Sequence, residues 1–335
     1  MTLPTRKIGP FTVSAIGLGC MNLSHAYGVP STAEEGAALL NRALDLGITL
    51  LDTAAIYGVG GNERLLGSTV MHRRGDFTLA SKCVLDVVDG KRVLDGRPET
   101  IRRTLEAALG RLGTDHIDLY YLHRLDAKVP IEESVGELKR AVEAGKIRTI
   151  GLSEMGAETI RRAHAVHPIA AVQSEYSPMV RNPEVAVLDT CRERGIGFVA
   201  FSPVARGMLA RGVRDDAYVP GDIRLAMPRF VGDNLRHNLT VVARFEALAA
   251  DAGMTPAQLA IGWVLARGDH IVPIPGTRSI AHLEEDVGAA TVSVPADLVE
   301  AVNELFDGTI RGARYSAPMQ AQIDTEILPG EELVA

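Results

Sequence analysis

Two side chains that could exchange protons, Asp52 and Tyr57, lie five residues apart, just beyond a short apolar run at residues 48–51. The run is partly β-branched and follows Gly47, so it predicts a buried strand that ends by presenting Asp52. Burial and neighbouring charges can move the pKa values of both groups, which favours proton chemistry. Taken alone, however, the pair is more typical of an ordinary turn with a packed aromatic.

Two further polar side chains could complete such a site. Lys82 and His123 each come directly after an apolar run that predicts a strand. An unpaired buried ammonium is costly, so Asp52 is the expected partner of Lys82. The Lys82 cation should lower the pKa of the Tyr57 phenol, and His123 should orient a carbonyl by hydrogen bonding. The four residues therefore predict a site in which Tyr57 delivers a proton to a carbonyl oxygen.

Each of these positions also has a plainer or rival interpretation. His123 alone is more often a structural histidine than a catalyst. Lys82 could form a Schiff base in a lyase, but Asp52 as a fixed counter-ion would keep the amine protonated and poorly nucleophilic. Cys83 is better explained as a small buried apolar residue than as a redox switch.

Apolar runs alternate with helical segments along the whole chain. Eight runs predict strands at residues 15–19, 48–51, 77–81, 117–122, 149–152, 170–173, 197–201 and 271–274. Helices are predicted to begin near Thr32, Pro98, Pro130, Asn182 and Thr255, and glycines are placed to end them. Nearly apolar strands separated by helices indicate parallel pairing with both sheet faces covered. The repeat predicts an α/β fold, a (β/α)₈ TIM barrel in one domain spanning residues 1–335.

Two segments depart from this alternation. Residues 6–13 predict an N-terminal β-hairpin, and residues 205–238, rich in Gly, Arg, Asp and Pro, predict a long loop that covers the site. In a barrel of this kind, catalytic groups gather at the carboxyl ends of the strands. Asp52, Lys82 and His123 all follow predicted strands, which places them at that end.

Composition and charge narrow the classes of function. The 335 residues carry a net charge of −7, which argues against nucleic acid or an anionic membrane as the main partner. No apolar run approaches the ~18 residues needed to span a bilayer, and the start lacks a signal-peptide core, so a cytoplasmic location is predicted. The three cysteines are far apart, which favours reduced thiols over disulfides or zinc.

A carbonyl that receives a proton also needs a hydride donor, so a nucleotide site is expected. The glycines at 58–61 lack the spacing of the Rossmann fingerprint, which argues against an ordinary two-domain dehydrogenase. In barrels, phosphate commonly binds beside the last two strands at the amino end of a helix. Gly276 and Thr277 lead into a predicted helix there, and Arg278 could neutralise an anion.

Short motifs recur in a fixed order from Gly17 to about Asp307. They read Leu-Gly-Cys-Met at 18–21, Leu-Asp-Thr-Ala at 51–54, Tyr-Gly at 57–58, Ala-Ser-Lys at 80–82, Tyr-Leu-His-Arg-Leu-Asp at 121–126, Gly-Leu-Ser-Glu at 151–154, Val-Gln-Ser-Glu-Tyr at 172–176, Phe-Ser-Pro at 201–203, Asp-Ile-Arg at 222–224, Pro-Arg-Phe at 228–230 and Pro-Gly-Thr-Arg at 275–278. In this order they make the sequence resemble the aldo-keto reductase family. The resemblance implies NADPH-dependent reduction of an aldehyde or ketone to an alcohol by a tetrad of Asp52, Tyr57, Lys82 and His123.

The resemblance also implies an extended NADP(H) lying across the barrel mouth. Ser153 and Gln173 would hold the carboxamide, and Phe201 would stack on the nicotinamide. The residues that the resemblance assigns to the cofactor are Met21, Asp52, Ser153, Gln173, Phe201, Ser202, Pro203, Val204, Ala205, Arg206, Gly207, Arg211, Arg224, Gly276, Arg278, His282, Glu285 and Asp286.

The sequence departs from the family pattern at three places. Asp286 stands where the family often has Asn, and a carboxylate can accept from the adenine amino group but cannot donate to a ring nitrogen. Asn22 replaces a frequent glycine, and Pro178 and Met179 replace a frequent large aromatic; both places are expected to flank the substrate pocket.

A rival interpretation is an NADP(H)-binding regulatory barrel with little turnover, similar to the subunits that associate with potassium channels. Those subunits resemble this chain but lack a histidine at the position of His123, so its presence favours an enzyme. The identity of the carbonyl substrate and the oligomeric state, including a homo-oligomer, are left open by the sequence.

Overall fold

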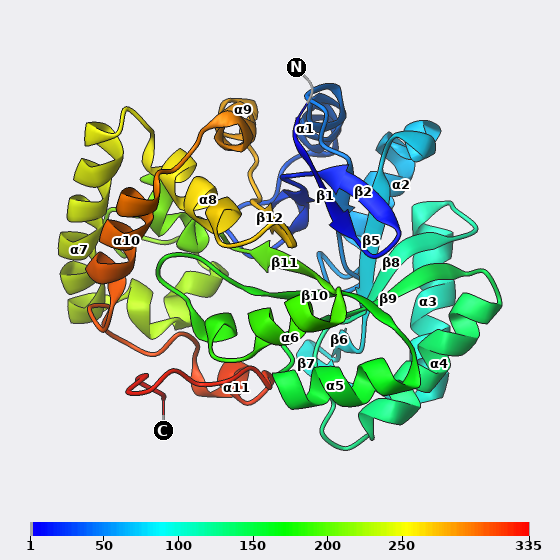
Figure 1. The fold of residues 1–335 in the computed structure, drawn as a ribbon. Coiled ribbons are helices and arrows are strands. Elements are labelled where there is room, and N and C mark those ends of the chain that lie inside the picture. The colour runs from blue at the N-terminus through cyan, green and yellow to red at the C-terminus, as the bar shows by residue number, and fades with distance from the viewer. Residues whose placement is uncertain (1–2, 335) are drawn as a thin grey trace.

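Eight parallel strands form one curved sheet at the centre of the computed structural model, which describes residues 3–334 (Figure 1). In spatial order they are β12 (Ile271–Ile274), β11 (Gly197–Phe201), β10 (Ile169–Glu175), β9 (Ile147–Ser153), β8 (Ile117–Leu122), β5 (Thr78–Cys83), β4 (Leu50–Asp52) and β3 (Leu18–Gly19). The two ends of the sheet meet, because the Gly17 and Gly19 amides donate to the Pro273 and Pro275 carbonyls, each over 3.0 Å. The predicted (β/α)₈ barrel is confirmed.

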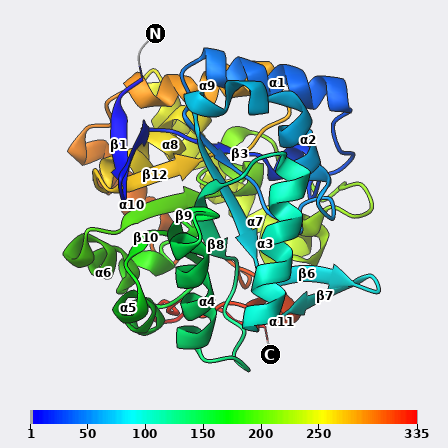
Figure 2. The same ribbon diagram turned by 90° about the vertical axis from the view of Figure 1, so that its right-hand side faces the viewer.

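Helices surround this sheet and follow its strands in the predicted alternation (Figures 1 and 2). They are α1 (Ala33–Asp45), α2 (Gly61–Thr69), α3 (Pro98–Leu112), α4 (Ile131–Glu143), α5 (Ala157–Val166), α6 (Val187–Arg194), α7 (Gly232–Asp251), α8 (Pro256–Ala266), α9 (Ile280–Gly288), α10 (Ala296–Phe306) and α11 (Ala317–Gln320). The predicted capping box at Thr32 and Glu35 is present, and Gly113 ends α3 at a φ of 67° that favours glycine. Within residues 3–334, no helix has both the length and the apolar character needed to cross a bilayer.

The first strands are shorter than the sequence predicts. The Ser14 amide donates to the Thr49 hydroxyl over 2.7 Å, and the Thr49 amide donates to the Ser14 hydroxyl over 2.9 Å. Side chains thus satisfy the backbone groups that a longer ladder would use. The regular strand β4 therefore begins only at Leu50, and it includes Asp52.

The predicted N-terminal hairpin is confirmed as β1 (Thr5–Ile8) and β2 (Phe11–Ser14). Ile8 and Val13 of this hairpin are buried in one cluster with side chains of the central strands, including Leu50 and Leu119. The hairpin fills the barrel interior from the end opposite Asp52. Chemistry is therefore confined to the carboxyl ends of the strands.

A second hairpin was not predicted. It consists of β6 (Leu85–Val88) and β7 (Lys91–Leu94), follows β5 and projects away from the barrel (Figure 2). Its turn residues Asp89 and Gly90 have φ values of 51° and 73°, as a tight hairpin turn requires. An Asp-Gly pair between two apolar runs is the sequence signal that could have revealed it.

The long covering segment is confirmed in part. It contains the short 3₁₀ turns Ala205–Ala210, Ile223–Ala226 and Pro228–Phe230, but its predicted end at residue 238 was wrong because α7 already begins at Gly232. The Gly, Asp and Asn at the start of α7 look like loop residues in the sequence. Leu235 and Asn238 are nevertheless buried on one face of the helix.

Candidate active site

The four residues predicted to act together meet at the carboxyl ends of β4, β5 and β8. The Lys82 ammonium donates to the Asp52 carboxylate and to the Thr53 carbonyl oxygen over 2.8 Å. It also lies 3.4 Å from the Tyr57 hydroxyl oxygen. The Tyr57 and His123 rings meet edge to face with centroids 5.8 Å apart, and all four side chains are buried.

The direction of the pKa shift of the phenol differs from the sequence prediction. Burial raises the pKa of Tyr57, and the nearby Lys82 charge lowers it by less, so the net shift is upward. The prediction of a net lowering was wrong because it weighed the cation but not the loss of solvent. Tyr57 therefore stays a phenol at neutral pH, the form that can donate a proton.

The two basic groups beside the phenol have opposite charge states. Burial lowers the pKa of Lys82, but the charges of Asp52 and Tyr57 and the hydrogen bonds to these two residues together more than offset this, and the pKa ends above its usual value. Burial, together with the charges of Arg124 and Lys82, holds the pKa of His123 well below its usual range. Lys82 is thus an ammonium and His123 a neutral imidazole. Its Nδ1 has no hydrogen-bond partner among residues 3–334.

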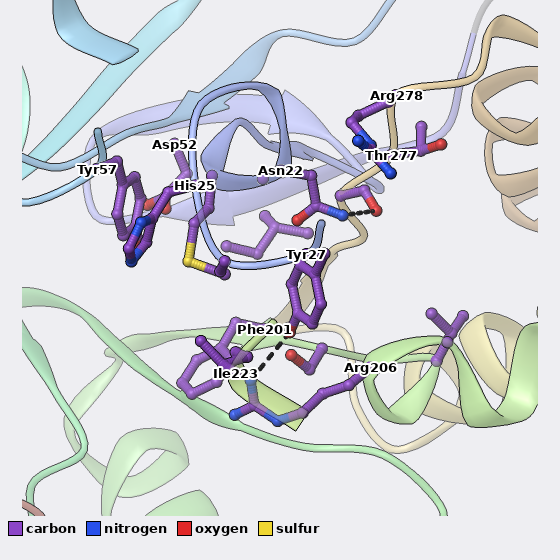
Figure 3. Close-up of a pocket in the computed structure, with 18 of the residues that line it drawn as sticks. Asn22, His25, Tyr27, Asp52, Tyr57, Phe201, Arg206, Ile223, Thr277 and Arg278 are labelled. Carbon is purple, nitrogen blue, oxygen red and sulfur yellow. Dashed lines mark hydrogen bonds between the residues drawn. The ribbon is translucent and has the colours of Figure 1, made fainter. Parts of the chain in front are cut away.

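An elongated cavity of about 750 Å³ extends from Tyr57 and His123 past Phe201 to the start of α9 (Figure 3). Of the predicted cofactor residues, it is lined by Met21, Asp52, Ser153, Gln173, Phe201, Ser202, Pro203, Val204, Arg206, Gly207, Arg224, Gly276, Arg278, His282, Glu285 and Asp286. Two predicted positions do not line it: Ala205 is buried behind the wall and Arg211 is exposed. The cavity thus joins Tyr57 and His123 to the predicted phosphate region.

The backbone after β11 has a conformation that non-glycine residues seldom adopt. Ser202, Ala205 and Arg206 have φ values of 52°, 48° and 55°. Such left-handed residues cost free energy and cluster where a binding site requires them. Successive residues in this kind of turn can point their amides into one concavity that suits an anion.

Three of the four arginines predicted to bind the cofactor line the cavity, and they differ in their partners. Arg206 is buried, pairs with Glu175 at 2.9 Å and donates to the Tyr27 hydroxyl over 3.0 Å (Figure 3). Arg224 pairs with Asp222 at 2.7 Å. Arg278 donates to the Val29 carbonyl oxygen and has no carboxylate within 4.0 Å among the described residues. Its charge remains available to an anion in the cavity.

Asp286 has an unusual charge state for an acidic residue. It is buried in the wall of the cavity on α9, and burial, together with the neighbouring charge of Glu285, raises its pKa to about 8. At neutral pH the group is therefore mostly a neutral carboxylic acid. In that form it has one O–H donor and acceptor oxygens, much like the amide expected from the resemblance.

Of the two departures from the family pattern expected to flank the substrate pocket, one lines the cavity and the other does not. Asn22 lines the cavity and its amide donates to the Gly276 carbonyl oxygen over 2.9 Å, so it ties the first loop to the last one. Pro178 and Met179 do not line the cavity, contrary to the expectation; Met179 is buried in the main core. Position 179 contributes to packing rather than to the pocket wall.

Several lining residues were missed by sequence reasoning. They come from the first loop, the unpredicted hairpin, the end of β8 and the C-terminal segment, and they include His25, Leu85, Arg92, Arg124, Tyr315 and Met319. Arg124 lies inside a motif that was recognised, but no role was given to it. The C-terminal residues offered no local signal, because only long-range contacts bring them to the site.

Within residues 3–334, no group of three or more His, Cys, Asp or Glu side chains is placed to hold a metal ion. The three cysteines are buried as free thiols. For Cys83, burial raises the pKa of the thiol, as expected of a packed residue rather than a reactive one.

The chain is similar in sequence to known proteins along most of its length. The sequence profile of the Aldo/keto reductase family matches residues 15–307. Aldo-keto reductase yakc [NADP(+)] of Schizosaccharomyces pombe is 43% identical over 340 residues, which cover 98% of this chain and 100% of that protein. Probable aldo-keto reductase 1 of Glycine max is 42% identical, over 91% of this chain and 89% of that protein.

Solved structures with the same fold are also similar along most of the chain. The glycerol dehydrogenase AKR11B4 of Gluconobacter oxydans superposes with a TM-score of 0.82 at 28% identity, covering 91% of this chain and 96% of that one. The aldo-keto reductase AKR11C1 of Bacillus halodurans, in its holo form, gives a TM-score of 0.74 at 26% identity, covering 93% and 98%.

Proposed function

The chain belongs to the aldo/keto reductase family, and we propose that it reduces an aldehyde or ketone to an alcohol with NADPH as hydride donor and Tyr57 as proton donor. The observation that carries this proposal is the contact of the Tyr57 hydroxyl with Lys82, itself paired with Asp52, at the closed end of the long cavity. A general acid must lie within reach of the cavity in its protonated form, and Tyr57 meets both conditions.

The residues present fit a phosphorylated dinucleotide. The cavity is elongated, the left-handed turns at Ser202 and Arg206 offer backbone amides, and the Arg278 guanidinium has no carboxylate within 4.0 Å among the described residues. The Gln173 amide donates to Asp52 over 2.8 Å, which orients its carbonyl oxygen to accept from a carboxamide. When bound, NADPH would supply the hydride.

In the proposed reduction, the Tyr57 phenol gives its proton to the carbonyl oxygen while a hydride reaches the carbonyl carbon. The Lys82 ammonium stabilises the phenolate left behind, and Asp52 holds that ammonium in place. His123, as a neutral imidazole, can donate a hydrogen bond to the same oxygen. Solvent then restores the proton of Tyr57, and the reverse sequence oxidises an alcohol.

The proposal is tested by following NADPH oxidation with a panel of aldehydes and ketones, and NADH oxidation with the same panel. Wild-type protein should oxidise NADPH faster than NADH, because Arg278 can neutralise the extra phosphate. Arg278→Met should reduce the ratio of NADPH to NADH oxidation rates by about tenfold, because it removes the charged hydrogen bonds to the extra phosphate. Tight NADPH binding without carbonyl-dependent oxidation would instead support the regulatory barrel.

The neutral form of Asp286 predicts that cofactor affinity depends on pH. Because the pKa of Asp286 is about 8, the acid form is present below pH 8 and is lost above it. The carboxylate cannot donate and adds negative charge beside Glu285, so the Kd for NADPH should rise by up to about fivefold between pH 8 and pH 9. Titration calorimetry at several pH values measures this.

Asp286→Asn is the matched control for this prediction, since the amide keeps one donor and one acceptor but does not titrate. The variant should bind NADPH with a Kd that no longer rises over this pH range. The same rise in the variant and in the wild type would assign the pH dependence to the cofactor phosphates or to another residue.

A further inference from the structure

The end of the cavity beside Tyr57 and His123 carries two arginines that the proposed mechanism does not use. Arg124 directly follows His123 at the end of β8, and Arg92 is supplied by β7 of the projecting hairpin. Both side chains line the cavity. Neither has a carboxylate within 4.0 Å in the part of the chain that the structure describes.

Arg124 is held in place by neutral partners. Its Nη1 donates to the His123 carbonyl oxygen over 2.6 Å and to the Ser153 hydroxyl over 3.2 Å. A guanidinium has five N–H donors, so most of them remain free. Its charge reaches the reacting groups, because it helps to lower the pKa of both His123 and Tyr57.

Arg92 lies close enough to Arg124 for the two charges to interact. Burial lowers the pKa of Arg92, and the charge of Arg124 lowers it further. Arg92 is exposed on β7 and Arg124 is half-buried, so water softens this repulsion, and an anion bound between the two guanidinium groups would relieve what remains of it. No carboxylate of the described chain lies within 4.0 Å of either group, so both are free to bind an anionic ligand.

The acidic residues of the cavity lie elsewhere or are already paired. Glu35, Glu285 and Asp286 line the part near Arg278 at the start of α9, and Asp52 is paired with Lys82. The catalytic end therefore carries the unpaired positive charges, while the acidic groups Glu35, Glu285 and Asp286 lie at the far end. This distribution of charge would attract an anionic group of a substrate to the catalytic end.

We propose that the carbonyl substrate carries an anionic group, a carboxylate or a phosphate, which Arg92 and Arg124 bind while its carbonyl meets Tyr57 and His123. This inference rests on the proposed reductase function and adds the substrate class to it. Arginine suits either anion because its planar fork can donate two parallel hydrogen bonds. The hairpin would then act as a specificity element that brings Arg92 to the mouth of the barrel.

The test uses one aromatic aldehyde with three para substituents: 4-carboxybenzaldehyde, its neutral methyl ester and 4-formylphenyl phosphate. Wild-type protein with NADPH should show a kcat/KM at least about tenfold higher for an anionic aldehyde than for the ester, mainly through KM. The carboxylate and phosphate arms show which anion is preferred. Added salt should reduce the advantage of the anion, because it screens exposed charges.

Substitutions locate the effect. Arg92→Gln and Arg124→Gln should each lower the ratio of anionic to ester kcat/KM by about fivefold or more, and Arg124→Lys should restore part of it. Arg244→Gln is the matched control, since Arg244 is exposed on α7 and does not line the cavity, and it should leave both rates unchanged. The KM for NADPH, measured in parallel, should stay the same in the variants in which the ratio of anionic to ester kcat/KM falls.

The outcomes separate this inference from the function on which it rests. The protein could reduce the ester as efficiently as either anion, or the ratio of anionic to ester kcat/KM could be equal in the wild type and both glutamine variants. Either result would overturn the proposal of an anionic substrate but leave the reductase function intact. Binding of NADPH without reduction of any of the three aldehydes overturns both.

Discussion

Tyr57→Phe should lower kcat for carbonyl reduction by about 10²–10⁴-fold, the usual contribution of a general acid. The substitution removes only the hydroxyl group, which lies 3.4 Å from Lys82. The ring should keep its packing against Ala54, Ile56 and Leu85, because none of these contacts involves the oxygen. The loss should therefore fall on the chemical step and not on folding or on NADPH binding.

Steady-state rates with a good carbonyl substrate, together with the Kd for NADPH, measure this effect. Tyr120→Phe is the matched control: Tyr120 is buried on β8, its hydroxyl has no hydrogen-bond partner among the described residues, and it does not line the cavity. It should keep full activity. A Tyr57→Phe protein with wild-type kcat would show that another group supplies the proton.

The fold could be predicted because its signals are local and repeated. Each strand is an apolar run of a few residues, and each helix has a recognisable start or end, as at Thr32 and Gly113. The positions of Asp52, Lys82 and His123 at one end followed from the barrel topology, since β4, β5 and β8 are neighbours in the sheet. Strand ends in a parallel barrel share one face, so this part of the site needed no tertiary information.

The parts that could not be predicted depend on long-range contacts or on the amount of burial. Tyr315 reaches the cavity because its hydroxyl group binds Glu175 and its neighbour Arg314 pairs with Glu154 at 2.9 Å. These pairs join residues that are far apart in the sequence, and no local motif in the C-terminal segment predicts them. The pKa of Tyr57 has the same origin, because its sign depends on how completely solvent is excluded.

Arg92 and Arg124, the two arginines of the proposed anion site, also could not be recognised from the sequence alone. The Asp-Gly turn of the hairpin was visible in the sequence, but its use as a wall of the cavity was not. Arg124 was visible as the neighbour of His123, yet its lack of an acidic partner became clear only when the surroundings were known. A charge without a partner is a property of three-dimensional packing, and it is the observation on which the proposal of an anionic substrate rests.

Lys82→Met should lower the free energy of unfolding by about 3–5 kcal/mol, because it leaves Asp52 as a buried charge without its cation. Methionine has a similar length to lysine, so the loss should come from the charge and not from a cavity. The amide of Gln173 would remain a partner of Asp52 but carries no compensating charge. Carbonyl reduction should also be lost, because no ammonium would stabilise the Tyr57 phenolate. Denaturant unfolding and steady-state rates measure the two effects.

A double variant distinguishes the charge from the rest of the side chain. Asp52→Asn combined with Lys82→Met removes both charges, so it should be more stable than Lys82→Met alone, although it still lacks the cation and should stay inactive. Stability would then recover in part in the double variant, whereas activity would stay absent in both variants. If the double variant were as unstable as the sum of the two single changes, the packing of lysine rather than its pairing with Asp52 would hold this part of the barrel together. If it regained activity, Tyr57 would not depend on a neighbouring ammonium, and the proposed proton transfer would have to be assigned differently.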